Sequence, residues 1–158
     1  MMKYQCPVIA VRDIERAKAF YQDILGQEVE LDLGKNVSFR DGLALQEDFA
    51  WLTGVPADSV LDRPHNMELY FETEAFDAFL ERLAAHPEVR QVHPPKRYPW
   101  QQRVVRLYDP DGHMVEVGES MEYLARMYVA QGYTVEQTAE LIQHPVKFVE
   151  DATRAERE

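Results

Sequence analysis

Apolar and polar positions along the chain switch from the period of a strand to that of a helix and back. The short β-branched run Cys6–Val11 predicts a strand, and Asp13 is placed to cap a helix at Ile14–Leu25, where apolar residues recur at helical spacing. Gly26 is typical of a helix C-terminus. Three short strands are predicted next, at Glu28–Leu33, Val37–Arg40 and Leu43–Gln46. The first part of the chain therefore has the order β-α-β-β-β.

The same order returns after a polar, proline-bearing connection. Met67–Glu72 predicts a strand and Glu74–Ala85 an amphipathic helix. Three more strands are predicted at Arg90–Pro94, Gln102–Tyr108 and Met114–Gly118, separated by the segment PPKRYP and by the turn Asp109–Gly112. A module of this size cannot bury one face of its sheet alone, so we expect the two modules to pair.

These elements predict an α+β fold. We assign residues 1–119 to one domain, in which modules 5–47 and 65–119 form a curved mixed sheet around a funnel. Residues 120–158 form a separate helical extension, which we call the tail. In the tail, Met121, Leu124, Met127 and Tyr128 make one apolar stripe. Further helices are expected at Val135–Gln143, capped by Thr134, and from Pro145 to about Thr153.

The charge balance limits the partners of this chain. It has 17 Lys and Arg against 28 Asp and Glu, a net charge of -11, which repels polyphosphate. The end of the tail has a helix-turn-helix look, but its acidic residues outnumber its basic ones. We therefore expect no nucleic-acid partner and no anionic membrane partner, and we expect the tail to dock on its own domain or on a dimer mate.

The single cysteine and the lack of a long apolar run indicate a cytoplasmic protein. Cys6 has no second cysteine with which to form an internal disulfide. No apolar run approaches the roughly 20 residues of a spanning helix, and the N-terminus lacks the basic and apolar regions of a secretory signal.

Two segments carry a family resemblance. They are VIAVRDIERAKAFYQDILG (Val8–Gly26) and LYDPDGHMVEV (Leu107–Val117). With the order of elements they resemble the vicinal oxygen chelate superfamily, which includes glyoxalase I, extradiol dioxygenases, methylmalonyl-CoA epimerase, and fosfomycin- and bleomycin-resistance proteins. The resemblance covers about Gln5 to Glu119. It implies a small-molecule ligand in the funnel and a homodimer.

Metal-containing members of that superfamily bind one divalent ion (Mn, Ni, Zn, Fe or Mg) that contacts two neighbouring substrate oxygens. The resemblance places Glu116 at the ligand position of the last strand. Glu68 stands where a histidine is expected, and Cys6 stands at the first-strand position. Glu47 follows the strand that should supply the fourth ligand. A metal would therefore rest on Glu116 and Glu68, with Glu116 also as the catalytic carboxylate.

A second interpretation needs no metal. Arg103 and Arg106 have opposite strand parity, so only one of them should share the face of Glu116, where a salt bridge would occupy the space of the ion. We favour this pair over the metal. Both arginines are candidate ligand-binding residues, together with Tyr70 on the fifth strand and Trp100 in the loop YPWQQR.

Two functions of the funnel therefore remain open, and a regulatory or assembly role of the helical tail is a third hypothesis. One is a metal-dependent lyase, isomerase or dioxygenase with an altered metal site, acting on a small oxygenated metabolite. The other is a metal-free small-molecule binder similar to the bleomycin-resistance proteins. His65 is a candidate at the rim of the funnel, whereas His113 is expected to be structural because its parity is opposite to that of Glu116.

Overall fold

A computed structural model describes residues 1–154, and residues 155–158 at the end of the predicted tail lie outside the described residues. The chain forms two compact units. The first consists of Met1–Met67, Glu88–Arg90 and Tyr108–Met114, and the second of Glu68–Pro87, Gln91–Leu107 and the chain from Val115 onward. Each unit carries one four-stranded mixed sheet, which confirms the predicted α+β fold with two βαβββ modules.

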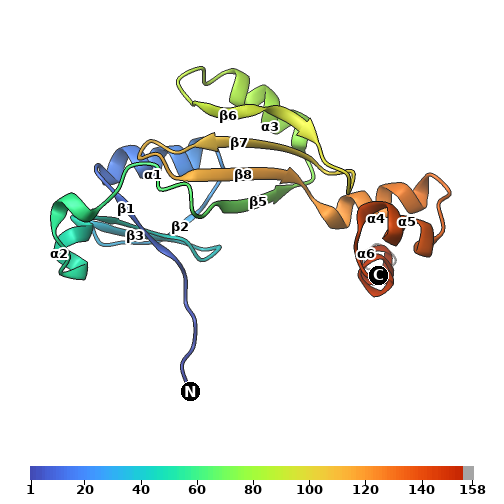
Figure 1. Ribbon diagram of the computed structural model, residues 1–158, viewed down its shortest axis with the longest axis horizontal. Coiled ribbons are helices and arrows are strands. Elements are labelled where there is room, and N and C mark those ends of the chain that lie inside the picture. The colour runs from blue at the N-terminus through green and yellow to red at the C-terminus, as the bar shows by residue number, and fades with distance from the viewer. Residues whose placement is uncertain (155–158) are drawn as a thin grey trace. The chain divides into compact units, whose positions relative to one another are not determined.

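The first module follows the predicted order. Its elements are β1 (Val8–Val11), α1 (Ile14–Asp23), β2 (Val29–Asp32), β3 (Asn36–Phe39) and β4 (Ala44–Glu47), drawn in blue to cyan in Figure 1. The strand order is β1-β4-β3-β2, with β1 parallel to β4 and the other neighbours antiparallel. The side chain of Asp13 accepts a hydrogen bond from the backbone N–H of Arg16, so it caps α1 as predicted.

The connection between the modules is more ordered than the sequence indicates. It contains α2 (Phe49–Thr53) and a 3₁₀ helix at Ala57–Ser59. Asp48 precedes α2 in a left-handed conformation, with φ 54°, and its side chain makes no capping hydrogen bond. A helix this short, without a capping side chain, leaves no periodic signal that sequence analysis could use.

The second module supplies β5 (Leu69–Thr73), α3 (Phe76–Ala84), β6 (Gln91–Arg97), β7 (Arg103–Tyr108) and β8 (Met114–Glu119), in the order β5-β8-β7-β6. The predicted end of β6 at Pro94 is wrong, because the strand continues to Arg97. Proline lacks the N–H that a central strand needs. β6 is an edge strand whose pairing with β7 is irregular, so the prolines are tolerated.

Strand register divides the second sheet into two chemically different faces. β5 and β8 are parallel, with Leu69 beside Val115 and Tyr70 beside Glu116. Leu69 and Val115 are buried on the face that α3 covers, whereas Tyr70 is 50% exposed on the other face. The predicted parity of β5 is therefore correct. We call the face that carries Tyr70 and Glu116 the open face.

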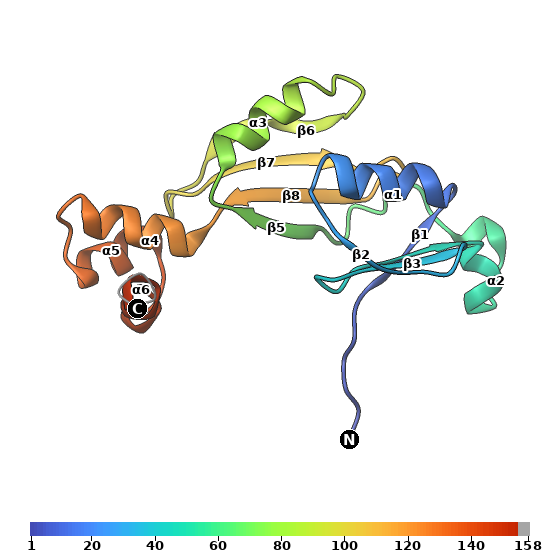
Figure 2. The ribbon, with the colours of Figure 1, turned by 180° about the vertical axis from the view of Figure 1, so that it is seen from behind.

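The tail adds α4 (Met121–Ala130), α5 (Val135–Ile142) and α6 (Val146–Arg154), which follow directly from the end of β8 (Figure 2). Thr134 forms a capping box with Gln137 at the start of α5. The three helices share an apolar cluster, the tail core, which consists of Met121, Leu124, Ala125, Ala139, Ile142, Val149 and Ala152. No helix within residues 1–154 is long and apolar enough to span a bilayer.

A buried hydrogen bond joins α1 to the turn that precedes β8. Tyr21 Oη donates to Oδ2 of Asp109 over 2.8 Å, and Oδ1 of Asp109 accepts from the backbone N–H groups of Asp111 and His113. Burial raises the pKa of Asp109, although these donors act in the opposite direction. The family-like turn is therefore held to the first module by one carboxylate.

We expect Tyr21→Phe to lower the free energy of unfolding by about 1–3 kcal/mol at pH 7, since it removes a donor from a buried carboxylate. It should also raise the pKa of Asp109 further. Because the pKa of Asp109 is raised in the folded state, its favourable contribution to stability is complete below the pKa of the unfolded chain, about 3.9. That contribution is lost as pH rises through the pKa of the folded state, so the variant should lose more stability at pH 7 than below pH 4. Urea unfolding at pH 7 and below pH 4 measures both effects, and an equal loss at both pH values would contradict this account.

Thr138 offers the opposite test. Its side chain is fully buried in α5, and its Oγ1 makes no hydrogen bond with any of residues 1–154. Thr138→Val replaces an unsatisfied hydroxyl by a methyl group of similar size, so we expect the free energy of unfolding to rise by about 1 kcal/mol. Thermal and urea unfolding would show this, and a destabilised variant would indicate that the hydroxyl has a bonding partner in solution.

Candidate functional site

The open face of the second sheet brings together most of the residues that the sequence singled out. Glu68 immediately precedes β5, Tyr70 lies on β5, Arg106 on β7 and Glu116 on β8. Glu116 is only 7% exposed, although it is charged. A buried carboxylate requires a partner, because removing it from water carries a large free-energy cost.

Arg106 is that partner. Its Nε donates to Oε2 of Glu68 over 2.8 Å, and its Nη2 forms an ion pair with Oε2 of Glu116. Oε2 of Glu116 makes no other regular hydrogen bond within residues 1–154, so the guanidinium is what balances its charge. Burial acts to lower the pKa of Arg106, but the hydrogen bond to Glu68 and the charge of Glu68 raise it above its ordinary value. The predicted arginine-carboxylate pair is thus present, and Arg106 makes it.

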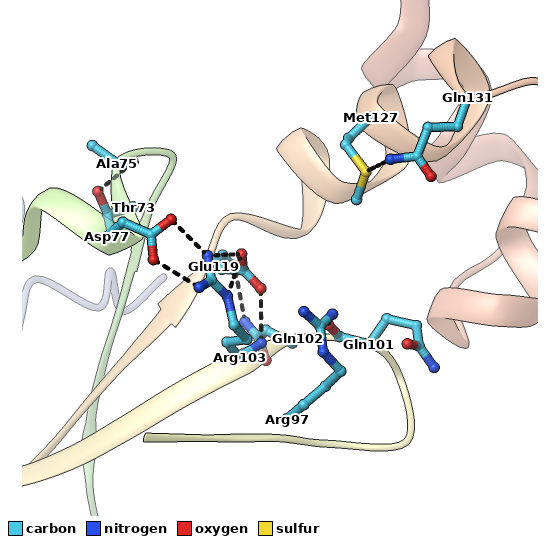
Figure 3. Close-up of polar contacts among 10 residues, drawn as sticks. All are labelled: Thr73, Ala75, Asp77, Arg97, Gln101, Gln102, Arg103, Glu119, Met127 and Gln131. Carbon is cyan, nitrogen blue, oxygen red and sulfur yellow. Dashed lines mark hydrogen bonds and ion pairs between the residues drawn. The ribbon is translucent and has the colours of Figure 1, made fainter. Parts of the chain in front are cut away.

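Arg103 lies on the face opposite to Arg106, as the opposite parity of the two arginines predicts. Figure 3 shows its guanidinium between Glu119 and Asp77 of α3, with Nε and Nη2 on Glu119 and Nη1 on Asp77. The guanidinium carbon of Arg103 also lies over the ring of Phe76, 5.1 Å from the ring centroid. Arg103 therefore fastens α3 to β7 and β8, and it does not share the open face with Glu116.

Two aromatic side chains from the loop between β6 and β7 lie beside Arg106. Nη1 of Arg106 donates to Tyr98 Oη, and the rings of Tyr98 and Trp100 stack with centroids 4.6 Å apart. Burial would raise the pKa of Tyr98, but Lys96 and Arg106 outweigh it and the pKa lies below its usual value. Trp100 also packs against the tail core. Its contact with a ligand stays a prediction. In the structure Trp100 contacts the Tyr98 ring and the tail core.

A chain of hydrogen bonds continues across the open face. Nε2 of Gln102 donates to Tyr70 Oη over 2.6 Å, and Tyr70 Oη donates in turn to Oε1 of Glu72 over 2.6 Å. Burial and the bond to Glu72 raise the pKa of Tyr70 to about 12, against the opposing effect of Gln102. Sequence analysis missed Gln102. It lies four residues before Arg106 and so shares its face, but parity alone does not distinguish an amide in a network from a solvated one.

The expected metal ligands of the first module belong to the first unit. Cys6 is half-buried and precedes β1. On β4, Oε1 of Gln46 accepts from the side chain of Asn36, and Oε2 of Glu47 accepts from the backbone N–H of Ile14 at the start of α1. These oxygens serve local structure in that unit.

The donor set does not fit the divalent ion that the superfamily implies. Glu68 and Glu116 already share one cation, the guanidinium of Arg106. Within residues 1–154 no group of three or more His, Cys, Asp or Glu side chains is arranged to hold a metal.

The two histidines that the sequence weighed have protein partners in the first unit. Nε2 of His113 lies 2.7 Å from the backbone oxygen of Ala10, as expected of a structural residue. Nε2 of His65 lies 2.8 Å from Tyr108 Oη. A cavity of about 290 Å³ opens near His113, but two of its charged lining residues, Arg12 and Asp111, pair with each other.

Comparison with known proteins agrees with the fold. The family of glyoxalase-like domains matches residues 4–122, which include both modules. This chain belongs to the glyoxalase-like family. No curated protein matches it. The family lies within the vicinal oxygen chelate superfamily, so the resemblance seen in the sequence is confirmed.

Solved structures extend the comparison. A protein of unknown function from Agrobacterium tumefaciens str. C58 is 42% identical over 76% of this chain and 95% of its own, with a TM-score of 0.67. A lactoylglutathione lyase from Agrobacterium tumefaciens is 27% identical over 75% and 93%, with a TM-score of 0.57. A fosfomycin resistance protein from Listeria monocytogenes, 24% identical over 76% and 94% with a TM-score of 0.58, shares the fold.

The buried pair of this glyoxalase-like protein should dominate the energetics of its open face. Arg106→Met leaves Glu116 buried without a counter-charge, and we expect a loss of about 3 kcal/mol in the free energy of unfolding. Glu68→Gln removes a partly exposed partner and should cost less than about 1 kcal/mol. Urea unfolding measures both.

The double variant Arg106→Met/Glu116→Gln is the control for this prediction. It removes both charges, so it should recover most of the loss caused by Arg106→Met. Equal costs for Arg106→Met and Glu68→Gln, or a double variant no more stable than Arg106→Met, would show that the pair is not the buried centre of this face.

Proposed function

We propose that this protein binds a small oxygenated metabolite without a metal ion, and that the guanidinium of Arg106 takes the place of the divalent cation. The observation that carries the proposal is the bridge from Arg106 to Glu68 and Glu116. It lies where the family resemblance puts the metal. A guanidinium and a divalent ion both offer positive charge to two neighbouring oxygen atoms.

The geometry of Arg106 suits such a ligand. Nε and Nη2 form a planar fork that can hold two oxygens of one group. Here two different carboxylates share the fork. Glu116 is buried, with a side chain 9% exposed, whereas the side chain of Glu68 is 37% exposed. A ligand that offers two adjacent oxygens can replace Glu68 at Nε with one oxygen and accept from Nη2 with the other. Nη2 has two hydrogens, so Glu116 can stay in place as the counter-charge.

We propose no catalytic role for Glu116. The sequence suggested Glu116 as a catalytic carboxylate, but its Oε2 is engaged by Arg106. A carboxylate held in this way is poorly placed to accept a proton from a substrate. The superfamily's metal-dependent lyase or isomerase chemistry is the alternative that the following experiment tests.

Oxalate is a suitable probe because it is small and carries adjacent oxygens. We expect calorimetric titration to detect oxalate binding to protein treated with EDTA, with no gain in affinity when Mn²⁺, Ni²⁺, Zn²⁺, Fe²⁺ or Mg²⁺ is added. Lactoylglutathione, the compound named in the lyase that is 27% identical, is a second probe, with a hydroxyl next to a carbonyl.

Matched variants identify the residue responsible. Arg106→Lys loses the planar fork and should weaken oxalate binding by at least roughly tenfold. Arg103→Lys makes the same change on the opposite face and should leave the affinity as it is. Glu68→Gln removes the competing carboxylate and should strengthen binding. Oxalate binding that needs an added metal, or that survives Arg106→Lys unchanged, would refute the proposal.

A further inference from the structure

Nearly all of the tail lies beyond the part of the chain that the family match covers. The family match ends at residue 122, and the compared structures cover about three quarters of the chain. Its three helices nonetheless have a core of their own, and Trp100, from the loop between β6 and β7, packs against that core. The tail therefore reaches the open face through one aromatic side chain.

From Trp100 a line of contacts leads to the guanidinium. Trp100 stacks on Tyr98 with an angle of 21° between the rings. Tyr98 Oη accepts from Nη1 of Arg106, and the guanidinium carbon lies 5.5 Å from the centroid of the Tyr98 ring. A planar cation against an aromatic ring is held in orientation as well as in place. The position of Tyr98 thus restricts how Arg106 can present its fork.

Gln102 ties the loop to the start of the tail. Its side chain is 3% exposed, and its amide is fully bonded: Oε1 accepts from Trp100 Nε1, and Nε2 donates to Tyr70 Oη and to the backbone oxygen of Glu119. Figure 3 shows Gln102 beside Glu119, where β8 ends and the chain turns into α4. Three different partners around one amide fix its orientation.

The space for this amide depends on one glycine. A Cβ atom added to Gly118 would lie 2.4 Å from Nε2 of Gln102, closer than real contacts allow. On the neighbouring strand, Oε2 of Glu72 accepts from the backbone N–H of Met121, the first residue of α4. The side chains of Gln102 and Glu72 therefore both form hydrogen bonds with the backbone at the junction between β8 and the tail.

We infer that the tail helices and Gln102 are positioning elements for Arg106: they hold the Tyr98–Trp100 stack in place, and the stack sets the orientation of the guanidinium that receives the ligand. The ligand side of this inference rests on the proposed function. The residues themselves need not touch the ligand. A chain that shares the two modules but lacks the tail would have to orient this arginine in another way.

Trp100 reports on this arrangement without any ligand. The chain has two tryptophans, and Trp51 is 81% exposed in the first unit, so Trp51→Phe leaves Trp100 as the only indole. In that background, Gln102→Leu, Gly118→Ala and Ile142→Ala disturb the amide, its space and the tail core respectively. We expect each to shift the Trp100 emission to longer wavelength and to increase its quenching by acrylamide.

Two further readouts follow the effect to the arginine. The Nε–H of Arg106, bonded to Glu68, should give a slowly exchanging ¹⁵N–¹H resonance, assigned by its absence in Arg106→Lys. This resonance should move or broaden in the three variants. Oxalate binding should weaken by about tenfold, the effect of losing one well-placed interaction.

Leu83→Ala is the matched control, because it opens a cavity in the core under α3, on the other face of the same sheet. It should lower stability without changing the Trp100 emission or the Arg106 resonance, and circular dichroism checks that all variants fold. If Leu83→Ala changes both signals as much as Gln102→Leu does, or if Gln102→Leu and Ile142→Ala change neither, the inference is overturned. If wild-type protein fails to bind oxalate, the proposed function fails, while emission and resonance still decide the positioning role.

Discussion

One buried negative charge organises the open face of the second sheet. Glu116 lies on a central strand with little access to water, and a carboxylate in that environment must be balanced locally. Arg106 balances it from the neighbouring strand. Because a guanidinium is planar and its donors point in fixed directions, the rest of its surroundings must fit around it. Glu68 and Tyr98 occupy two of those directions, and the loop and the tail are arranged behind Tyr98.

Under the proposed function, this glyoxalase-like fold keeps its architecture while a guanidinium takes the place of a metal ion. The last-strand glutamate is retained, but the cation beside it is part of the chain. A bound ion brings open coordination positions, whereas a guanidinium brings a fixed fork that is already partly shared with carboxylates. In the proposed function, a ligand is recognised by exchange with the partly exposed Glu68. The use of a guanidinium also makes the geometry of the site depend on the groups that contact Arg106, and so on the loop and the tail.

Local patterns in the sequence were enough to predict most of the helices and strands. Asp13 and Thr134 both cap the helices that they were expected to cap, because capping needs only residues three positions apart. Strand parity placed Tyr70 and Glu116 on one face, since alternation is a local property of an extended chain. Errors occurred where the environment outweighs local preference. β6 runs through two prolines because it is an edge strand, and α2 forms without a capping side chain.

The sequence by itself determined the two βαβββ modules, the helical tail, and the rule that only one of Arg103 and Arg106 could share a face with Glu116. Tertiary structure decided which arginine it was, because that depends on which face of the sheet α3 covers and where Asp77 and Glu119 capture the other guanidinium. It also decided the role of Gln102, which bonds Tyr70 and Glu119 from two other parts of the chain as well as the nearby Trp100. Hydrogen bonds between such distant residues leave no local pattern, so only folding brings them together.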